Sequence, residues 1–221
     1  MKAVLYLLCL MAFSSQAQEL FWEYGQALTS FDYKNSQGNE LDNLQGKTFS
    51  FVNVGTRIPL FKEALQFTGS FNWDRFGALG SDGVLNNYFD WETTYFGAIL
   101  GLDSKVIGAG NFSWHLQAGA GPEFLVQGSQ TLNNQVFDLT EQEDFNGAVF
   151  LFRLGSQFEY QVLDGVSLAL SYHFGKSSNV GSDTSEELSF KAHQLGLKMY
   201  FNIASGKNAE EEKINSTNQE N

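Results

Sequence analysis

After a short hydrophobic N-terminal segment, the chain alternates apolar and polar side chains through eight stretches of roughly ten or more residues. Side chains repeat with a period of two in a strand and of 3.6 in a helix, so this pattern predicts strands. The connections between the stretches alternate between long and short. An even number of strands, with short turns at one end and long loops at the other, is typical of a small outer-membrane β-barrel.

The sequence therefore predicts an all-β fold, an eight-stranded antiparallel up-and-down transmembrane β-barrel. The expected strands are 20–33, 49–60, 65–76, 91–102, 112–126, 147–161, 166–175 and 188–203. The expected short connections are 61–64, 103–111 and 162–165, and the long ones are 34–48, 77–90, 127–146 and 176–187. Short turns lie on the periplasmic side of such barrels, so we expect both chain ends in the periplasm.

Alternation alone does not separate a barrel in lipid from a soluble sandwich, because a half-buried soluble sheet alternates as well. The minority face of these strands is rich in glycine and carries charges of both signs, which favours a packed polar lumen. Aromatic residues also gather near the strand ends, where membrane interfaces would lie. They are Trp22, Tyr24, Trp73, Trp91, Trp114, Tyr160, Tyr172 and Tyr200. A soluble secreted β-sandwich or lipocalin-like barrel remains the structural alternative.

The two ends of the chain are expected to lie outside the barrel. Residues 1–17 combine Lys2, an apolar run and small residues at Ser15 and Ala17, as a cleaved secretory signal does. Residues 204–221 are polar, acidic and free of aromatic side chains, which predicts a disordered periplasmic tail. The barrel would then span 18–203. The formal net charge of −12 excludes nucleic acid as a partner, because nucleic-acid binding needs a basic face.

At this point the chain resembles the small outer-membrane β-barrel proteins of Bacteroidota, which share the architecture of the OmpA transmembrane domain. The resemblance is carried by Ser15-Gln16-Ala17-Gln18, by the glycine-rich Leu116-Gln117-Ala118-Gly119-Ala120-Gly121 and by Leu195-Gly196-Leu197-Lys198-Met199-Tyr200-Phe201. It implies a location in the cell outer membrane, contact with outer-membrane lipid and lipopolysaccharide, and insertion by the barrel assembly machinery. It implies no single activity.

The interior of an eight-stranded barrel is just wide enough for side chains to fill. The inward face should carry a polar network, formed by Arg57, His115, Glu123, Arg153, Glu159, His173 and Lys198. Because an unpaired charge in a low-dielectric interior is costly, we expect these charges to satisfy one another. The alternative is a narrow channel for small solutes.

Two histidines raise the alternative of an outer-membrane enzyme of the lipid acylase or protease type. His115 shares its face with Ser113, and His173 shares its face with Ser171. Catalysis by such residues needs a nucleophile within hydrogen-bond reach of its base, and an orienting acid. A spacing of two residues on one strand does not guarantee that contact, and no catalytic or metal-ligand motif surrounds either histidine. We therefore expect structural histidines, no catalysis and no cofactor.

The long loops hold eleven acidic residues against Lys34, Lys47 and Lys176. Aromatic residues lie beside these acids, and exposed aromatics often anchor contacts. The candidate contact residues are Tyr88, Phe89, Phe137, Asp138, Glu141, Glu143 and Asp144. They would bind a membrane-protein partner, or divalent cations that bridge to lipopolysaccharide, since hard cations prefer oxygen ligands. The sequence thus favours a non-catalytic barrel with a structural or scaffolding role in the envelope.

Overall fold

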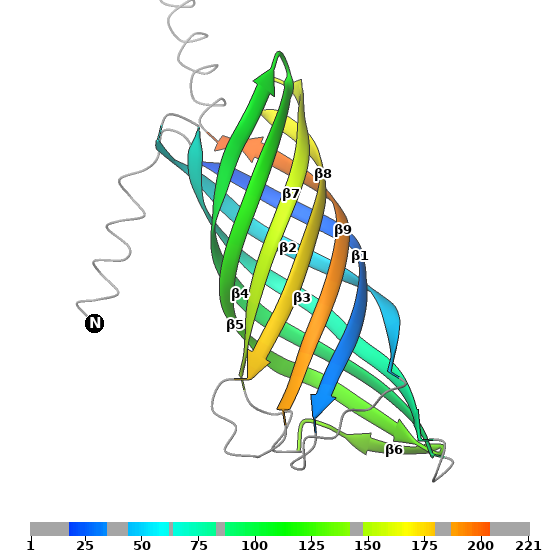
Figure 1. Cartoon of the computed structure of the whole chain (residues 1–221). Coiled ribbons are helices and arrows are strands. Elements are labelled where there is room, and N and C mark those ends of the chain that lie inside the picture. The colour runs from blue at the N-terminus through cyan, green and yellow to red at the C-terminus, as the bar shows by residue number, and fades with distance from the viewer. Residues whose placement is uncertain are drawn as a thin grey trace, which may run out of the picture.

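Eight long antiparallel strands close into a barrel in the computed structural model, which describes residues 18–34, 44–61, 64–82, 87–141, 148–179 and 187–203 (Figure 1). The strands are β1 (Glu19–Lys34), β2 (Gln45–Phe61), β3 (Leu65–Asp82), β4 (Asn87–Ala109), β5 (Phe112–Leu132), β7 (Val149–Leu163), β8 (Val166–Asn179) and β9 (Glu187–Asn202). Each pairs with the next barrel strand, and β9 returns to pair with β1 along its whole length. The predicted eight-stranded antiparallel barrel is confirmed.

The two ends of the barrel differ. The turn end carries the two-residue turns Gly110-Asn111 and Asp164-Gly165, and lies at the top of Figure 1. Gly110 and Gly165 have φ values of 59° and 80°, a conformation that glycine adopts without strain. The chain ends also meet there, because the amide of Ile203 donates to the carbonyl of Gln18 at 3.1 Å. The opposite end, from which the long connections leave, is the loop end.

A ninth, short strand lies at the loop end and was not predicted. This strand, β6 (Gln135–Asp138), pairs with the last residues of β5. Asn133 and Asn134 form the turn between them, with left-handed φ values of 47° and 68°. Two successive residues with positive φ suit the right-handed twist of a hairpin, and asparagine tolerates them well. The segment 127–146 is therefore partly a hairpin. Likewise, 103–111 was predicted as a connection, but β4 continues through most of it to Ala109.

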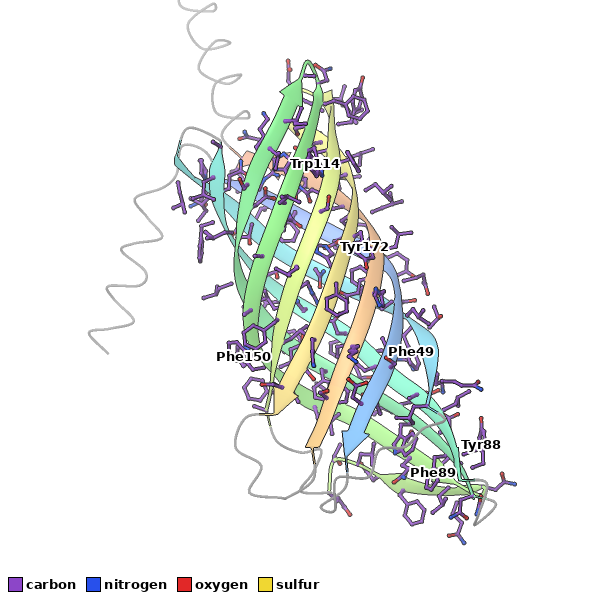
Figure 2. The ribbon with its side chains drawn as sticks, in the orientation of Figure 1. Phe49, Tyr88, Phe89, Trp114, Phe150 and Tyr172 are labelled. Atoms are coloured by element: carbon purple, nitrogen blue, oxygen red, sulfur yellow. The ribbon has the colours of Figure 1, made fainter. Side chains whose placement is uncertain are left out.

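The outer surface is apolar around the barrel, as contact with hydrocarbon requires. Large side chains such as Phe71, Leu100 and Leu197 expose 60% or more of their surface. Trp114 and Tyr172 lie among the side chains that surround the strands in Figure 2. Two aromatics assigned to the membrane interfaces lie elsewhere, since Trp91 and Tyr200 point inward and are buried. No helix among the described residues is long and apolar enough to cross a membrane.

Near the loop end, the lumen holds a cluster of buried apolar and aromatic side chains, which we call the aromatic seal. Its buried members are Phe31, Phe76, Ala78, Trp91, Tyr95, Ile99, Leu139, Val149, Leu151, Phe190 and Ala192. Phe190 lies at its centre, with ring centroids 4.9, 5.2 and 5.3 Å from those of Phe31, Phe76 and Tyr95. Leu139 follows β6 and is fully buried against the seal, and its amide donates to the carbonyl of Gly128. The hairpin thus folds back over the barrel opening.

Candidate functional site

The polar interior between the seal and the turn end forms three clusters along the barrel axis. The turn-end cluster consists of Glu19, Arg57, Asp103, Ser113, His115, Gln117, Gln157 and Glu159. The middle cluster consists of Glu23, Asn53, Ser171, His173 and Lys198. The third cluster lies nearest the seal, is called the seal-side cluster, and consists of Asp74, Glu123, Arg153 and Gln194. In the turn-end cluster, residues from opposite walls meet because the lumen of eight strands is narrow, whereas the middle cluster joins the neighbouring strands β2, β1, β9 and β8.

Arg57 organises the turn-end cluster. Its guanidinium donates to both carboxylate oxygens of Glu159, at 2.8 and 3.1 Å, and to Glu19 at 2.5 Å. The ring centroid of Tyr200 lies 3.8 Å from the Arg57 Cζ atom, so an aromatic face covers the cation. A bidentate ion pair of this kind fixes the orientation of both side chains and compensates their opposite charges.

His115 joins a hydroxyl and a carboxylate within the same cluster. Its Nδ1 atom lies 2.6 Å from Asp103 Oδ1, and its Nε2 atom lies 2.9 Å from Ser113 Oγ. A carboxylate only accepts hydrogen bonds, so Nδ1 carries the proton when His115 is neutral, and Nε2 accepts from the Ser113 hydroxyl. The spacing of two residues between Ser113 and His115 is therefore short enough for contact on this strand.

Three more side chains lie close to the Asp103 carboxylate. Gln117 donates to its Oδ2 atom at 2.6 Å, and Gln157 lies 3.5 Å from the same atom. Arg57 lies 3.7 Å away and supplies positive charge. Since Oδ2 is taken by the glutamines, Oδ1 faces His115.

The turn-end cluster borders a cavity of about 290 Å³ that we call the cup. Ser113, His115 and Arg57 lie in its wall, together with Lys105 on β4 and the turn at Gly110-Asn111. His115 is buried, whereas Ser113 is half-buried. The hydroxyl of Ser113 thus lies between a buried imidazole and open space.

The middle cluster uses the same residue types differently. Ser171 donates to Glu23 Oε1, and His173 Nε2 lies 3.0 Å from that same oxygen. Lys198 and Asn53 bind the other carboxylate oxygen at 3.3 and 2.9 Å. In this cluster the serine and the histidine both bind the carboxylate of Glu23. Gly155 makes room for the ring, because a Cβ atom at this position would overlap the His173 imidazole.

In the seal-side cluster, Arg153 and Gln194 bind the two oxygens of Asp74, at 2.9 and 2.7 Å. Glu123 is fully buried nearby, and neither of its oxygens has a hydrogen-bond donor among the described residues.

All seven residues expected in the lumen network are buried inside the barrel, and they fall into the three clusters. Sequence reasoning missed their main acidic partners, Glu23, Asp74 and Asp103. It placed Asp103 in a connection, and it left the face of the first strand undecided. Glu23 lies opposite Asn53 and Lys198 in register, so its inward face becomes clear once the strand register is known.

The predicted contact residues at the loop end differ in how exposed they are. Tyr88, Phe137, Asp138 and Glu141 are exposed, while Phe89 packs partly against the seal. Tyr88 and Phe89 lie at the loop end of the barrel in Figure 2. Glu143 and Asp144 lie outside the described residues. Hydrogen bonds from the amide and hydroxyl of Thr140 lower the pKa of Asp138. No group of three potential metal ligands occurs within the described ranges, and cation binding by the loops stays a prediction.

No protein-family model and no curated protein sequence matches this chain. Solved structures with a similar fold include Ail, the attachment invasion locus protein of Yersinia pestis, at 16% identity and a TM-score of 0.42, covering 84% of this chain and 99% of that chain. Neisserial surface protein A is similar at 11% identity and 0.47, covering 83% and 97%. The outer-membrane protease OmpT from Escherichia coli is similar at 6% identity and 0.49, covering 86% and 98%. Identities this low describe a likeness of fold alone.

Proposed function

We propose that the protein is a sealed, non-conducting barrel of the cell outer membrane that supports or scaffolds the envelope through its loop-end surface. Both termini and the short turns would face the periplasm, and the hairpin of β5 and β6 would face outward. The aromatic seal carries this proposal. Among the described residues, Phe31, Phe76 and Phe190 pack together in the lumen beside the buried Leu139, which favours a barrel without a continuous polar path for a solute.

The loop-end surface has the composition of a contact site. Val136 exposes 70% of its surface and Tyr88 exposes 50%, and both stand beside acidic residues. Exposed apolar side chains within a polar surround are common at protein interfaces. This role requires no catalysis, and it does not involve the turn-end cluster at the opposite end of the barrel.

Conductance tests the sealed lumen. Purified, refolded protein in a planar bilayer should give no steady open-channel current, and persistent currents from homogeneous material would exclude the proposal. Phe190→Ala opens the centre of the seal, and it should be compared with Phe152→Ala, which removes a lipid-facing ring. Only the first variant should increase ion leakage.

A photo-crosslinking residue at Val136 tests the contact site in native membranes. It should capture a defined protein that mass spectrometry identifies. The matched control places the same residue at Leu163, which is 66% exposed at the turn end. Capture of the same proteins from both positions, or of none at Val136, would show that the loop end docks no protein.

A further inference from the structure

We propose that Ser113, His115 and Asp103 form a nucleophile, base and acid that hydrolyse small, water-soluble carboxylic esters in the cup. Their atoms form an unbroken chain of hydrogen bonds from Oγ through both imidazole nitrogens to the carboxylate, at 2.9 and 2.6 Å. A general base must lie within about 2.6–3.2 Å of the proton that it removes. The order of the three groups is also the one that activates a serine hydroxyl.

The contrast with the middle cluster sets this arrangement apart from ordinary packing of polar groups. Ser171 and His173 share the spacing of Ser113 and His115, yet Ser171 donates to Glu23 and not to its histidine. Ser171 is also fully buried. In the turn-end cluster, the serine binds the histidine and borders open space, as a nucleophile requires.

The acid is positioned by residues that do not touch the cup's contents. Gln117 and Gln157 hold Asp103 Oδ2, so that Oδ1 is directed at the imidazole. Glu159 lies 3.8 Å from His115 Nε2, beyond hydrogen-bond distance, and its oxygens are bound by Arg57. The Nε2 lone pair is therefore left to the Ser113 hydroxyl. Asp103, Gln117 and Gln157 are positioning residues.

The cup determines the class of substrate. Its volume of about 290 Å³ lies at the small end of ligand sites, and its wall carries the charged residues Glu19, Arg57, Lys105 and Glu159. Such a wall favours a polar molecule with a short acyl group over a lipid chain. Lys105 and Arg57 add positive charge to the same wall that carries Ser113, and positive charge in such a site favours the ester oxygen that becomes negative.

The reaction balances without a cofactor. The Ser113 oxygen attacks the ester carbonyl as its proton passes to His115 Nε2, and a carbon–oxygen bond forms. The carbon–oxygen bond to the leaving alcohol then breaks, and the alcohol takes the proton from His115. Water repeats the sequence on the acyl-serine, releasing a carboxylic acid and restoring the hydroxyl. Asp103 remains a carboxylate and stabilises the imidazolium in each half.

The test uses the full-length mature protein, refolded in detergent micelles, with two probes. A fluorophosphonate should add to Ser113, forming a phosphorus–oxygen bond and releasing fluoride, and peptide mass spectrometry would locate the adduct. Hydrolysis of p-nitrophenyl acetate gives the rate, and the palmitate ester should be hydrolysed more slowly because its chain exceeds the cup. Heat-dependent electrophoretic migration shows that each variant is folded.

Ser113→Ala should abolish the adduct, and His115→Gln should lower kcat for the acetate by at least about 100-fold. Asp103→Asn should lower kcat while leaving KM unchanged, a split that a purely structural role would not produce. Ser171→Ala is the matched control and should retain both the adduct and the rate. A folded wild type that gives no adduct at Ser113, or a Ser113→Ala variant as active as the wild type, would overturn the proposal. Failure here would leave the sealed barrel untouched, because conductance and crosslinking measure that separately.

Discussion

Arg57 on β2 and Glu159 on β7 stand 102 positions apart in the sequence and meet inside the barrel through two hydrogen bonds, at 2.8 and 3.1 Å. Both side chains are buried. This pair joins opposite walls, so the strands that carry it are coupled through the lumen as well as through the sheet.

Removal of one member of this pair should destabilise the barrel strongly. Arg57→Met leaves Glu159 as a buried charge without its partner, and should lower the free energy of unfolding by about 3–5 kcal/mol. The double variant with Glu159→Met removes both charges and should recover part of that loss. Urea unfolding followed by tryptophan fluorescence measures both. Additive losses in the double variant would show that the two residues act independently.

Arginine on the lipid-facing surface should oppose insertion. Leu197 and Leu170 are exposed on the outside of the barrel, by 68% and 49%. Leu197→Arg or Leu170→Arg should cost about 2–4 kcal/mol near the bilayer midplane. Leu197→Ala is the control for lost apolar area. Equilibrium refolding into lipid vesicles measures the cost, and refolding of Leu197→Arg as efficient as that of the wild type would mean that the outer face is assigned wrongly.

The seal should contribute more stability than the aromatic residues that face lipid. Phe190→Ala removes a buried ring with three aromatic neighbours and should cost about 3–5 kcal/mol. Phe158→Ala removes a ring that is 57% exposed on the outside, and should cost clearly less. Unfolding midpoints in the same micelles give the comparison, and equal midpoints would contradict a packed seal.

The turn after β6 should respond to acid. Hydrogen bonds from Thr140 favour the Asp138 carboxylate and hold its pKa below the ordinary value of 3.8. A depressed pKa stabilises the folded turn above the ordinary value, and that contribution is lost as the pH falls through the lowered pKa. An NMR titration of the Thr140 amide should show this transition below pH 3.8. In Thr140→Val the pKa of Asp138 should move back toward its ordinary value.

The orientation in the membrane can be read by labelling. Cysteine at Asp164 on the turn end should react with a membrane-impermeant maleimide only after the outer membrane of cells is permeabilised. Cysteine at Val136 on the loop end should react in intact cells. The opposite result would place the long loops in the periplasm.

The architecture was predictable because a period of two is a local property of sequence. Alternation around Arg57, Arg153 and Lys198 places each on the inner face, and the barrel does bury them there. The partners of these residues were not predictable, since the depth of a side chain depends on strand register. Asp103 shows this best. It reaches His115 because β4 runs on past the expected end, with a bulge between Lys105 and Ile107 that adjusts its pairing with β5.

The seal escaped prediction for a related reason. Trp91 lies near a strand end, so it was assigned to an interfacial girdle, but it is buried within the seal. Tyr200 was assigned there for the same reason, although the alternation that places Lys198 inside also places Tyr200 inside. The short strand β6 did have a local signal, namely the turn-forming pair Asn133-Asn134 directly before it.

The meeting of Ile203 with Gln18 has a practical consequence. Asn202, the residue before Ile203, borders the cup, so a purification tag or reporter fused close to either end of the barrel would sit over its mouth. Such a fusion could block small molecules while leaving the barrel intact, and an assay of the fused protein would then mistake an obstructed entrance for an inert site.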